Sequence, residues 1–315
     1  MSLTLSRRQY IQRFPVFLAA GSFTSRVFGN AEGHPSISFP VQPRERLSVT
    51  SWPFRAYFKT PANRNGDSSK PKMDMRDFPR FVKDTFGINN INPLKDHFSS
   101  TDPAYLADFN RAVDGAKSKV VDLGLGGKAF YSPDKSARDA AVVFGREGID
   151  MAVAVRSPSV RQHVSGAAGL RADPALAAES LGRLAEYGAQ RNVIVNLEND
   201  HPVAEDPFFL AEVLQRVNNP YLRSLPDLGN SLVGHDEDYN ERGVRAMFKY
   251  AYSMCHVKDV LQGDGKQYTV NLARMFEIAK ASGYRGYYSM EFDTGSGDAV
   301  AGTKRLAEET LKFLS

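Results

Sequence analysis

The chain has 315 residues, of which 42% are hydrophobic and 24% are charged, a composition typical of a globular protein with one large domain or two small ones. Of its 40 basic residues, four are arginines before residue 31, where no acidic residue stands, and the other 36 equal the 36 acidic residues. We therefore expect no nucleic-acid partner. The single cysteine, Cys255, excludes an internal disulfide.

The first 31 residues are predicted to be an export signal. The segment Ser6–Gln12 contains the pair Arg7-Arg8 and resembles a twin-arginine signal, and an apolar run, Phe14–Phe23, follows it. This run is too short for a stable membrane anchor. We expect an exported, periplasmic protein, and the alternative is an amphipathic start of a cytoplasmic one.

The rest of the chain, residues 32–315, alternates predicted strands with predicted helices. A long polar loop, Tyr57–Met75, would overhang the mouth of a barrel. Met151–Val155 is expected to be a strand because its continuous apolar residues suit a strand buried on both faces. The first four strands are expected at Leu47–Trp52, Ile88–Ile91, Val120–Leu125 and Met151–Val155.

Four further strands are expected at Val193–Glu198, Leu222–Asp227, Tyr252–His256 and Tyr287–Glu291, with helices predicted over Pro207–Val217, Val244–Tyr252 and Leu272–Ala281 between them. One unit of an eightfold βα barrel takes about 31 residues. Eight such units predict a single α/β domain, a (β/α)8 TIM barrel. No glycine-rich phosphate motif follows the first strand, which argues against a dinucleotide-binding fold.

Each of the last four strands ends on a residue that can bind a cation. Glu198, Asp227, His256 and Glu291 follow one another at intervals of 29, 29 and 35 residues. The carboxyl ends of barrel strands meet at one face, where active sites lie. Two Glu, one Asp and one His suit one divalent metal ion such as Mn, Mg, Co or Zn. We predict a metal site there, although Asp227 could instead cap a turn before Gly229.

These strand ends, with the runs Asp227-Leu228-Gly229-Asn230 and His256-Val257-Lys258-Asp259, resemble the sugar phosphate isomerase/epimerase family with the xylose isomerase-like barrel. The resemblance implies one divalent metal ion, a sugar or polyol substrate, and a possible homo-oligomer. In the ketose 3-epimerases of that family two metal-bound glutamates also move the proton. By position these are Glu198 and Glu291. Where that subgroup commonly has His, this chain has Asn230.

Six further residues are candidates for substrate contacts, four after the ligand strands and two near the ends of the first two strands: Asn199, His201, Asn230, Lys258, Trp52 and His97. Lys258 could neutralise an oxyanion or simply pair with Asp259 or another acid. Trp52 could stack on a sugar or pack in the core. His201 suits a substrate contact and a surface loop equally.

We expect a metal-dependent isomerase or epimerase that removes a proton next to a carbonyl and passes through an enediolate. The alternative is an exported metal-dependent lyase or hydrolase that uses the same proton abstraction on a 3-keto glycoside. A non-catalytic sugar-binding barrel would not need two metal-bound glutamates. A DNA-cleaving enzyme with three zinc ions would need more ligands and a basic groove.

Overall fold

Parallel strands form the inner ring of the fold. The computed structural model describes residues 35–164 and 171–314, so the predicted signal, residues 1–31, lies outside the described residues. One set of paired strands consists of β2 (Asn90–Asn92), β1 (Leu47–Thr50), β11 (Tyr287–Met290) and β8 (Met254–Val257). The other consists of β4 (Leu123–Leu125), β5 (Ser159–Gln162), β6 (Ile194–Glu198) and β7 (Leu222–Leu225).

Two seams join these sets into a closed barrel. On one side β3 (Lys119–Val120) pairs with β2, and β4 begins three residues later and pairs with β5, so one interrupted strand bridges both sets. On the other side Asp227 and His256 form a parallel bridge between the ends of β7 and β8. The prediction of a TIM barrel is confirmed. A short antiparallel hairpin, β9 (Val260–Gly263) and β10 (Lys266–Thr269), follows β8.

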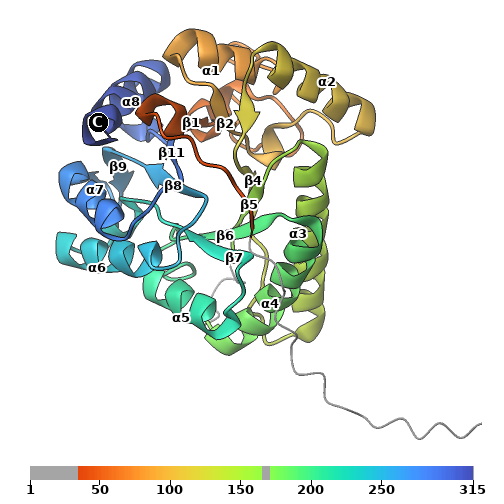
Figure 1. Ribbon diagram of the computed structural model, residues 1–315, viewed down its shortest axis with the longest axis vertical. Coiled ribbons are helices and arrows are strands. Elements are labelled where there is room, and N and C mark those ends of the chain that lie inside the picture. Colours follow the sequence, from red (N-terminus) through yellow and green to blue (C-terminus); the bar gives the residue numbers. More distant parts are fainter. Residues whose placement is uncertain (1–34, 165–170, 315) are drawn as a thin grey trace, which may run out of the picture. The chain divides into compact units, whose positions relative to one another are not determined.

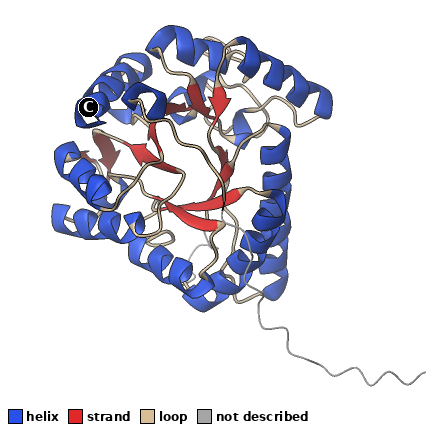
Figure 2. Ribbon diagram, in the orientation of Figure 1, coloured by secondary structure: helices blue, strands red, loops and turns tan. Residues whose placement is uncertain are grey.

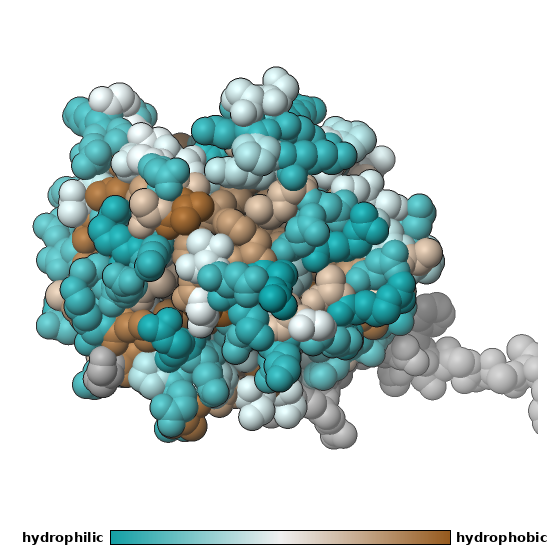
Figure 3. Space-filling model, turned by 90° about the horizontal axis from the view of Figure 1, so that it is seen from above, coloured by the Kyte–Doolittle hydropathy of each residue, from teal (hydrophilic) through white to brown (hydrophobic). Residues whose placement is uncertain are grey.

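Helices surround the strands (Figures 1 and 2). They are α1 (Phe78–Phe86), α2 (Pro103–Gly115), α3 (Lys135–Ala154), α4 (Pro174–Arg191), α5 (Pro207–Val217), α6 (Glu237–Phe248), α7 (Leu272–Ala281) and α8 (Ala299–Leu314). Several begin at an aspartate followed by proline, as at Asp173, whose side chain accepts hydrogen bonds from the amides of Ala175 and Leu176. Hydrophilic side chains cover most of the face shown in Figure 3. Within the described residues no helix is both long and apolar enough to cross a membrane.

The prediction of a fourth strand at Met151–Val155 is wrong. Residues up to Ala154 form the last turns of α3, and β5 begins at Ser159. A short apolar run fits a buried strand and one side of a packed helix equally well. Here Met151 is buried and Val153 is 45% exposed, the one-sided pattern of a helix on the barrel surface. The strand that forms this part of the barrel, β5, is polar. It therefore places polar side chains at the mouth of the barrel that the prediction did not expect there.

The predicted loop Tyr57–Met75 is largely irregular, and it packs on the barrel. It leaves the 3₁₀ turn η2 (Trp52–Tyr57), and Phe58 and Met75 are both fully buried. The ring of Phe58 stacks on His97, with 4.7 Å between ring centroids. His97 belongs to η3 (Lys95–His97), which follows β2. The loop therefore covers the carboxyl end of the first two strands.

Candidate active site

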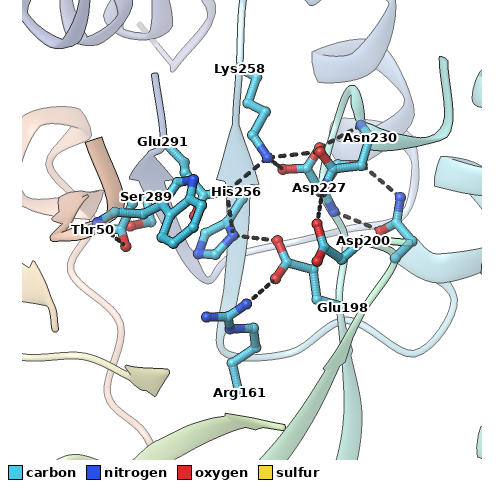
Figure 4. Close-up of polar contacts among 12 residues, drawn as sticks. Thr50, Arg161, Glu198, Asp200, Asp227, Asn230, His256, Lys258, Ser289 and Glu291 are labelled. Carbon is cyan, nitrogen blue, oxygen red and sulfur yellow. Dashed lines mark hydrogen bonds and ion pairs between the residues drawn. The ribbon is translucent and has the colours of Figure 1, made fainter. Parts of the chain in front are cut away.

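The four predicted ligands meet at the carboxyl ends of their strands (Figure 4). Glu198 ends β6, Asp227 follows β7, His256 lies in β8 and Glu291 follows β11. One ligand atom from each residue lies within 4.8 Å of those of the others. All four are buried, with at most 5% of any residue exposed. The tertiary structure thus unites residues spread over almost a hundred positions of the chain.

Two cationic side chains lie among the three carboxylates. The Nδ1 atom of His256 is 2.5 Å from Glu198 Oε1 and 3.2 Å from Glu291 Oε2. The Nζ atom of Lys258 is 2.9 Å from Asp227 Oδ2 and 2.8 Å from Glu291 Oε2. The positive charges of protonated His256 and Lys258 therefore offset part of the negative charge of the three carboxylates.

These contacts shift the pKa values strongly. Burial lowers the pKa of His256, but Glu198 and Glu291 outweigh burial and raise it to about 10. Burial raises the pKa of Glu291, but His256 and Lys258 hold it well below its usual value. Burial dominates at Asp227 and raises its pKa to about 6 despite Lys258. Three buried carboxylates so close together require positive charge, which protons or a metal ion can supply.

Asp227 shows that the cluster fits a cation. Its Oδ1 accepts hydrogen bonds from the amides of Gly229 at 2.8 Å and Asn230 at 2.7 Å. Its Oδ2 is buried, lies beside Lys258 Nζ, and receives no well-oriented hydrogen bond. The predicted turn cap and the predicted ligand therefore use different oxygens of one carboxylate. Three carboxylate oxygens and one imidazole nitrogen form a donor set that suits Mn, Mg, Co or Zn.

Asn92, at the end of β2, sets the orientation of the imidazole. Its Oδ1 lies 3.0 Å from His256 Nε2, and its amide nitrogen donates to the backbone oxygen of Asp122 at 3.1 Å. Because Oδ1 can only accept, Nε2 carries the proton and Nδ1 faces the carboxylates. A metal-binding histidine typically has such a partner on its other nitrogen.

Two of the predicted substrate residues, Asn230 and Lys258, lie beside the cluster. Asn230 Oδ1 accepts a hydrogen bond from Lys258 Nζ at 2.8 Å, and its amide nitrogen donates to Asp200 Oδ1 at 3.2 Å. The alternative for Lys258, an ion pair with Asp259 or another acid, holds for other acids: Lys258 pairs with Asp227 and Glu291. Asp259 instead forms an ion pair with Arg305 at 2.7 Å.

Asn199 and His201 make contacts within the protein. Asn199 Nδ2 donates to the backbone oxygen of Asp227 and to Ser231 Oγ at 3.1 Å each, and its Oδ1 accepts from the amide of Asp227 at 2.8 Å. It therefore holds Asp227 in place. His201 is exposed, and its Nδ1 accepts from the amides of Val203 and Ala204, both at 3.2 Å. This contact stabilises a surface turn, the second of the two roles expected for His201.

Trp52 and His97 lie in the turns that follow β1 and β2. Trp52 is half-buried, and the guanidinium carbon of Arg55 lies 4.3 Å from the centroid of its ring. His97 is buried, and its Nδ1 lies 2.8 Å from Ser51 Oγ. Burial, with help from Arg55 and Arg161, lowers the pKa of His97 to about 3. His97 is therefore neutral near pH 7.

Two residues that the sequence reasoning missed, Arg161 and His163, also lie at this mouth. Arg161, in β5, places Nη1 2.8 Å from Glu198 Oε2. His163 follows it, with Nδ1 3.0 Å from Glu205 Oε2. They were missed because the fourth strand was expected at Met151–Val155. The alternation of Ser159, Arg161 and His163 with other residues is the period of a strand with one polar face, and it was the available signal.

The comparisons with known proteins agree with this architecture. A family model described as "Xylose isomerase-like TIM barrel" matches residues 84–315. No curated protein matches the sequence significantly.

Several solved structures have a similar fold. A D-allulose 3-epimerase from Methylomonas sp. in complex with D-allulose is 16% identical, with a TM-score of 0.64 over 89% of this chain and 98% of that one. A 3-keto-D-glucoside 4-epimerase from E. coli is 14% identical, with a TM-score of 0.60 over 85% and 98%. A xylose isomerase-like TIM barrel protein from Mycobacterium smegmatis in complex with magnesium is 14% identical, with a TM-score of 0.63 over 90% and 98%.

Proposed function

Because the chain belongs to the xylose isomerase-like TIM barrel family, we propose that it is a metal-dependent sugar isomerase or epimerase that removes a proton next to a carbonyl. The observation that carries the proposal is the buried cluster of Glu198, Asp227, His256 and Glu291 at the mouth of the barrel. The similar structures support it, because two of them are named as sugar 3- and 4-epimerases. The proposed substrate is a small sugar or polyol.

The cluster is the proposed site of one divalent ion, with manganese expected and Mg, Co and Zn as alternatives; a similar structure contains magnesium. When bound, such an ion polarises a carbonyl and lowers the pKa of the neighbouring C–H bond. Glu198 Oε1, Asp227 Oδ2, His256 Nδ1 and Glu291 would hold it. Asn199 and Asn92 keep the ligands of β7 and β8 oriented.

Glu291 is placed to move the proton. Its Oε2 contacts His256 and Lys258, and no partner of Oε1 occurs within the described part of the chain. Oε1 is therefore the oxygen that can accept a proton from the carbon next to the carbonyl. The Lys258 ammonium lies 2.8 Å from Oε2 and can donate a hydrogen bond to the oxygen of the enediolate as charge develops there.

A lyase or hydrolase acting on 3-keto glycosides is the second candidate. The same proton abstraction next to the ketone would expel a group β to the carbonyl. The likeness to a 3-keto-D-glucoside 4-epimerase favours it, as does the proposed export of the protein, since phosphorylated sugars are scarce outside the cytoplasm.

Proton exchange tests both candidates. The manganese-loaded protein is incubated in deuterated water with D-allulose, D-fructose, D-tagatose or a 3-keto glucoside, and the products are followed by NMR. Deuterium next to the carbonyl with inversion or isomerisation supports the first candidate, and release of the aglycone supports the second. Absence of exchange on every substrate, with the metal bound, would reject both.

A further inference from the structure

A chain of contacts runs from Glu205 to the metal-site carboxylate Glu198. Glu205 is only 3% exposed, and it accepts hydrogen bonds from the amide of Val164 at 2.6 Å and from His163 Nδ1 at 3.0 Å. These two contacts fix the imidazole with its Nδ1 proton toward Glu205. The other ring nitrogen, Nε2, is then an acceptor that faces the barrel mouth.

Arg161 connects this imidazole to the cluster. Its Nη1 donates to His163 Nε2 and also to Glu198 Oε2, the latter at 2.8 Å. The space for the guanidinium comes from Gly124, because a Cβ there would lie 2.8 Å from Arg161 Nη2. In Figure 4, Arg161 and Lys258 approach the carboxylates from opposite sides of His256. His163 thus holds the Arg161 guanidinium in place, and the guanidinium donates a hydrogen bond to one oxygen of Glu198, Oε2.

His163, Asp200 and Glu205 also resemble a second cation site, since one ligand atom of each lies within 4.8 Å of the others. The position of Arg161 argues against this interpretation. Its guanidinium contacts His163 Nε2, the nitrogen that a cation would need, and would repel the cation. His163 Nδ1 is already bound to Glu205.

This inference rests on the proposed metal-dependent function. We propose that Arg161 is a positioning residue, held in place by His163 and Glu205. It binds Oε2 of Glu198, so this carboxylate can bind the metal ion only through Oε1. Oε1 points at the cluster, 2.5 Å from His256 Nδ1. Both oxygens of Glu198 therefore already have a partner, whereas Oε1 of Glu291 is left to accept a proton from the substrate. Proton transfer at this site is asymmetric, with Glu291 as the carboxylate that carries the proton.

Arg161 also makes the net charge of the metal-binding cluster less negative. It adds one buried positive charge beside three carboxylates, and its side chain is only 8% exposed. Removal of this charge leaves the metal-free cluster more negative, so the metal-free protein becomes less stable and the cation binds more tightly. A merely structural arginine would have the opposite effect, because local damage weakens metal binding.

The test measures manganese affinity by calorimetry on chelator-treated protein, together with melting temperatures with and without manganese. The variant is Arg161→Met. The matched control is Arg138→Met, because the Arg138 side chain is also 8% exposed and pairs with Glu179 in α4 at 3.0 Å, outside the cluster. We expect Arg161→Met to bind manganese about tenfold more tightly and to lose more melting temperature without the metal than with it. The control should lose melting temperature equally in both conditions.

His163→Gln tests whether the imidazole acts through Arg161. Alone it should tighten manganese binding by about threefold, and added to Arg161→Met it should change nothing further, because its target is already absent. Weaker or unchanged binding in Arg161→Met, additive effects in the double variant, or two manganese ions per chain would each overturn the proposal.

Sugar turnover separates this inference from the proposed function. With the metal effects as expected and no exchange on any sugar, the positioning role stands and the proposed function fails. With exchange present and the metal effects reversed, the function stands and the positioning role fails. Absence of any manganese binding by the unchanged protein would overturn both.

Discussion

Asp227 and His256, 29 residues apart in the sequence, form one of two parallel bridges that close the barrel between β7 and β8; the other joins Ser224 and Ala251. The amide of His256 donates to the backbone oxygen of Pro226 at 3.0 Å, and the amide of Leu228 donates to that of His256 at 3.2 Å. The same backbone contacts that close the barrel therefore place two of the proposed metal ligands side by side. Metal binding and barrel stability should be coupled as a result.

Asp227→Asn should separate these two effects. The amide oxygen of asparagine can still accept the hydrogen bonds from Gly229 and Asn230, so the variant should fold. It loses the charged Oδ2, so manganese should no longer stabilise it. In the unchanged protein a ligand at 100 times its dissociation constant stabilises by about 2.7 kcal/mol, or roughly 5 °C or more. Thermal melts with manganese and with chelator measure the difference, and an equal metal-induced shift in the variant would contradict the ligand role.

Glu291→Gln should remove turnover while weakening metal binding less than Asp227→Ala does. Glutamine can still offer an oxygen ligand, but it cannot accept the substrate proton. We expect a loss of at least about a hundredfold in the rate of proton exchange. NMR in deuterated water gives the rate, and calorimetry gives the metal affinity of both variants. Near-normal exchange in Glu291→Gln would show that another group moves the proton.

Asn92→Ala should weaken metal binding by about 10- to 100-fold, because the proton on His256 Nε2 loses its partner and Nδ1 no longer faces the cluster reliably. The control is Asn90→Ala in the same strand. The amide of Asn90 donates to the backbone oxygens of Glu45 and Leu47, both at 2.7 Å, so this variant should lose stability without losing metal affinity. Equal metal affinities in the two variants would contradict the role of Asn92.

His97 should make the protein less stable in mild acid. Its folded pKa is lowered to about 3, so its contribution is fully present above the unfolded pKa near 6.5 and is lost as the pH falls toward 3. The loss by pH 5 is about 2 kcal/mol. In urea titrations, the difference in free energy of unfolding between the unchanged protein and His97→Gln should shrink by this amount from pH 7 to pH 5. The exposed His235→Gln serves as the control, and a constant difference for His97→Gln would count against the prediction.

The proposed export rests on Arg7 and Arg8. Replacing both with lysine should block export, because twin-arginine signals depend on the arginine pair. Immunoblots of periplasmic and cytoplasmic fractions would show the protein only in the cytoplasm. The matched control replaces Arg13 and Arg26 with lysine, which keeps the same charge and should leave export intact. Unchanged export of the Arg7/Arg8 variant would reject the signal.

The sequence alone sufficed for the barrel and for the four converging residues at its mouth. The reason is geometric, because parallel strands that recur about every 31 residues all end at one face of the barrel. Glu198, Asp227, His256 and Glu291 lie at or next to the carboxyl ends of successive barrel strands, so their convergence follows from their positions. The positions of Lys258 and Asn230 beside them could be anticipated for the same reason, since each lies within three residues of a predicted ligand.

Only the tertiary structure decided which segment entered the barrel as the fourth strand. Met151–Val155 is apolar and could pack as a strand or as a helix, and the barrel selected the polar segment of β5 instead. That choice brought Arg161 to Glu198, 37 residues later, and His163 to Glu205, 42 residues later. No local sequence pattern encodes such contacts. Hydrophobic periodicity indicates which face of a helix or strand is buried, but it does not indicate which charged side chain of another element that face will contact.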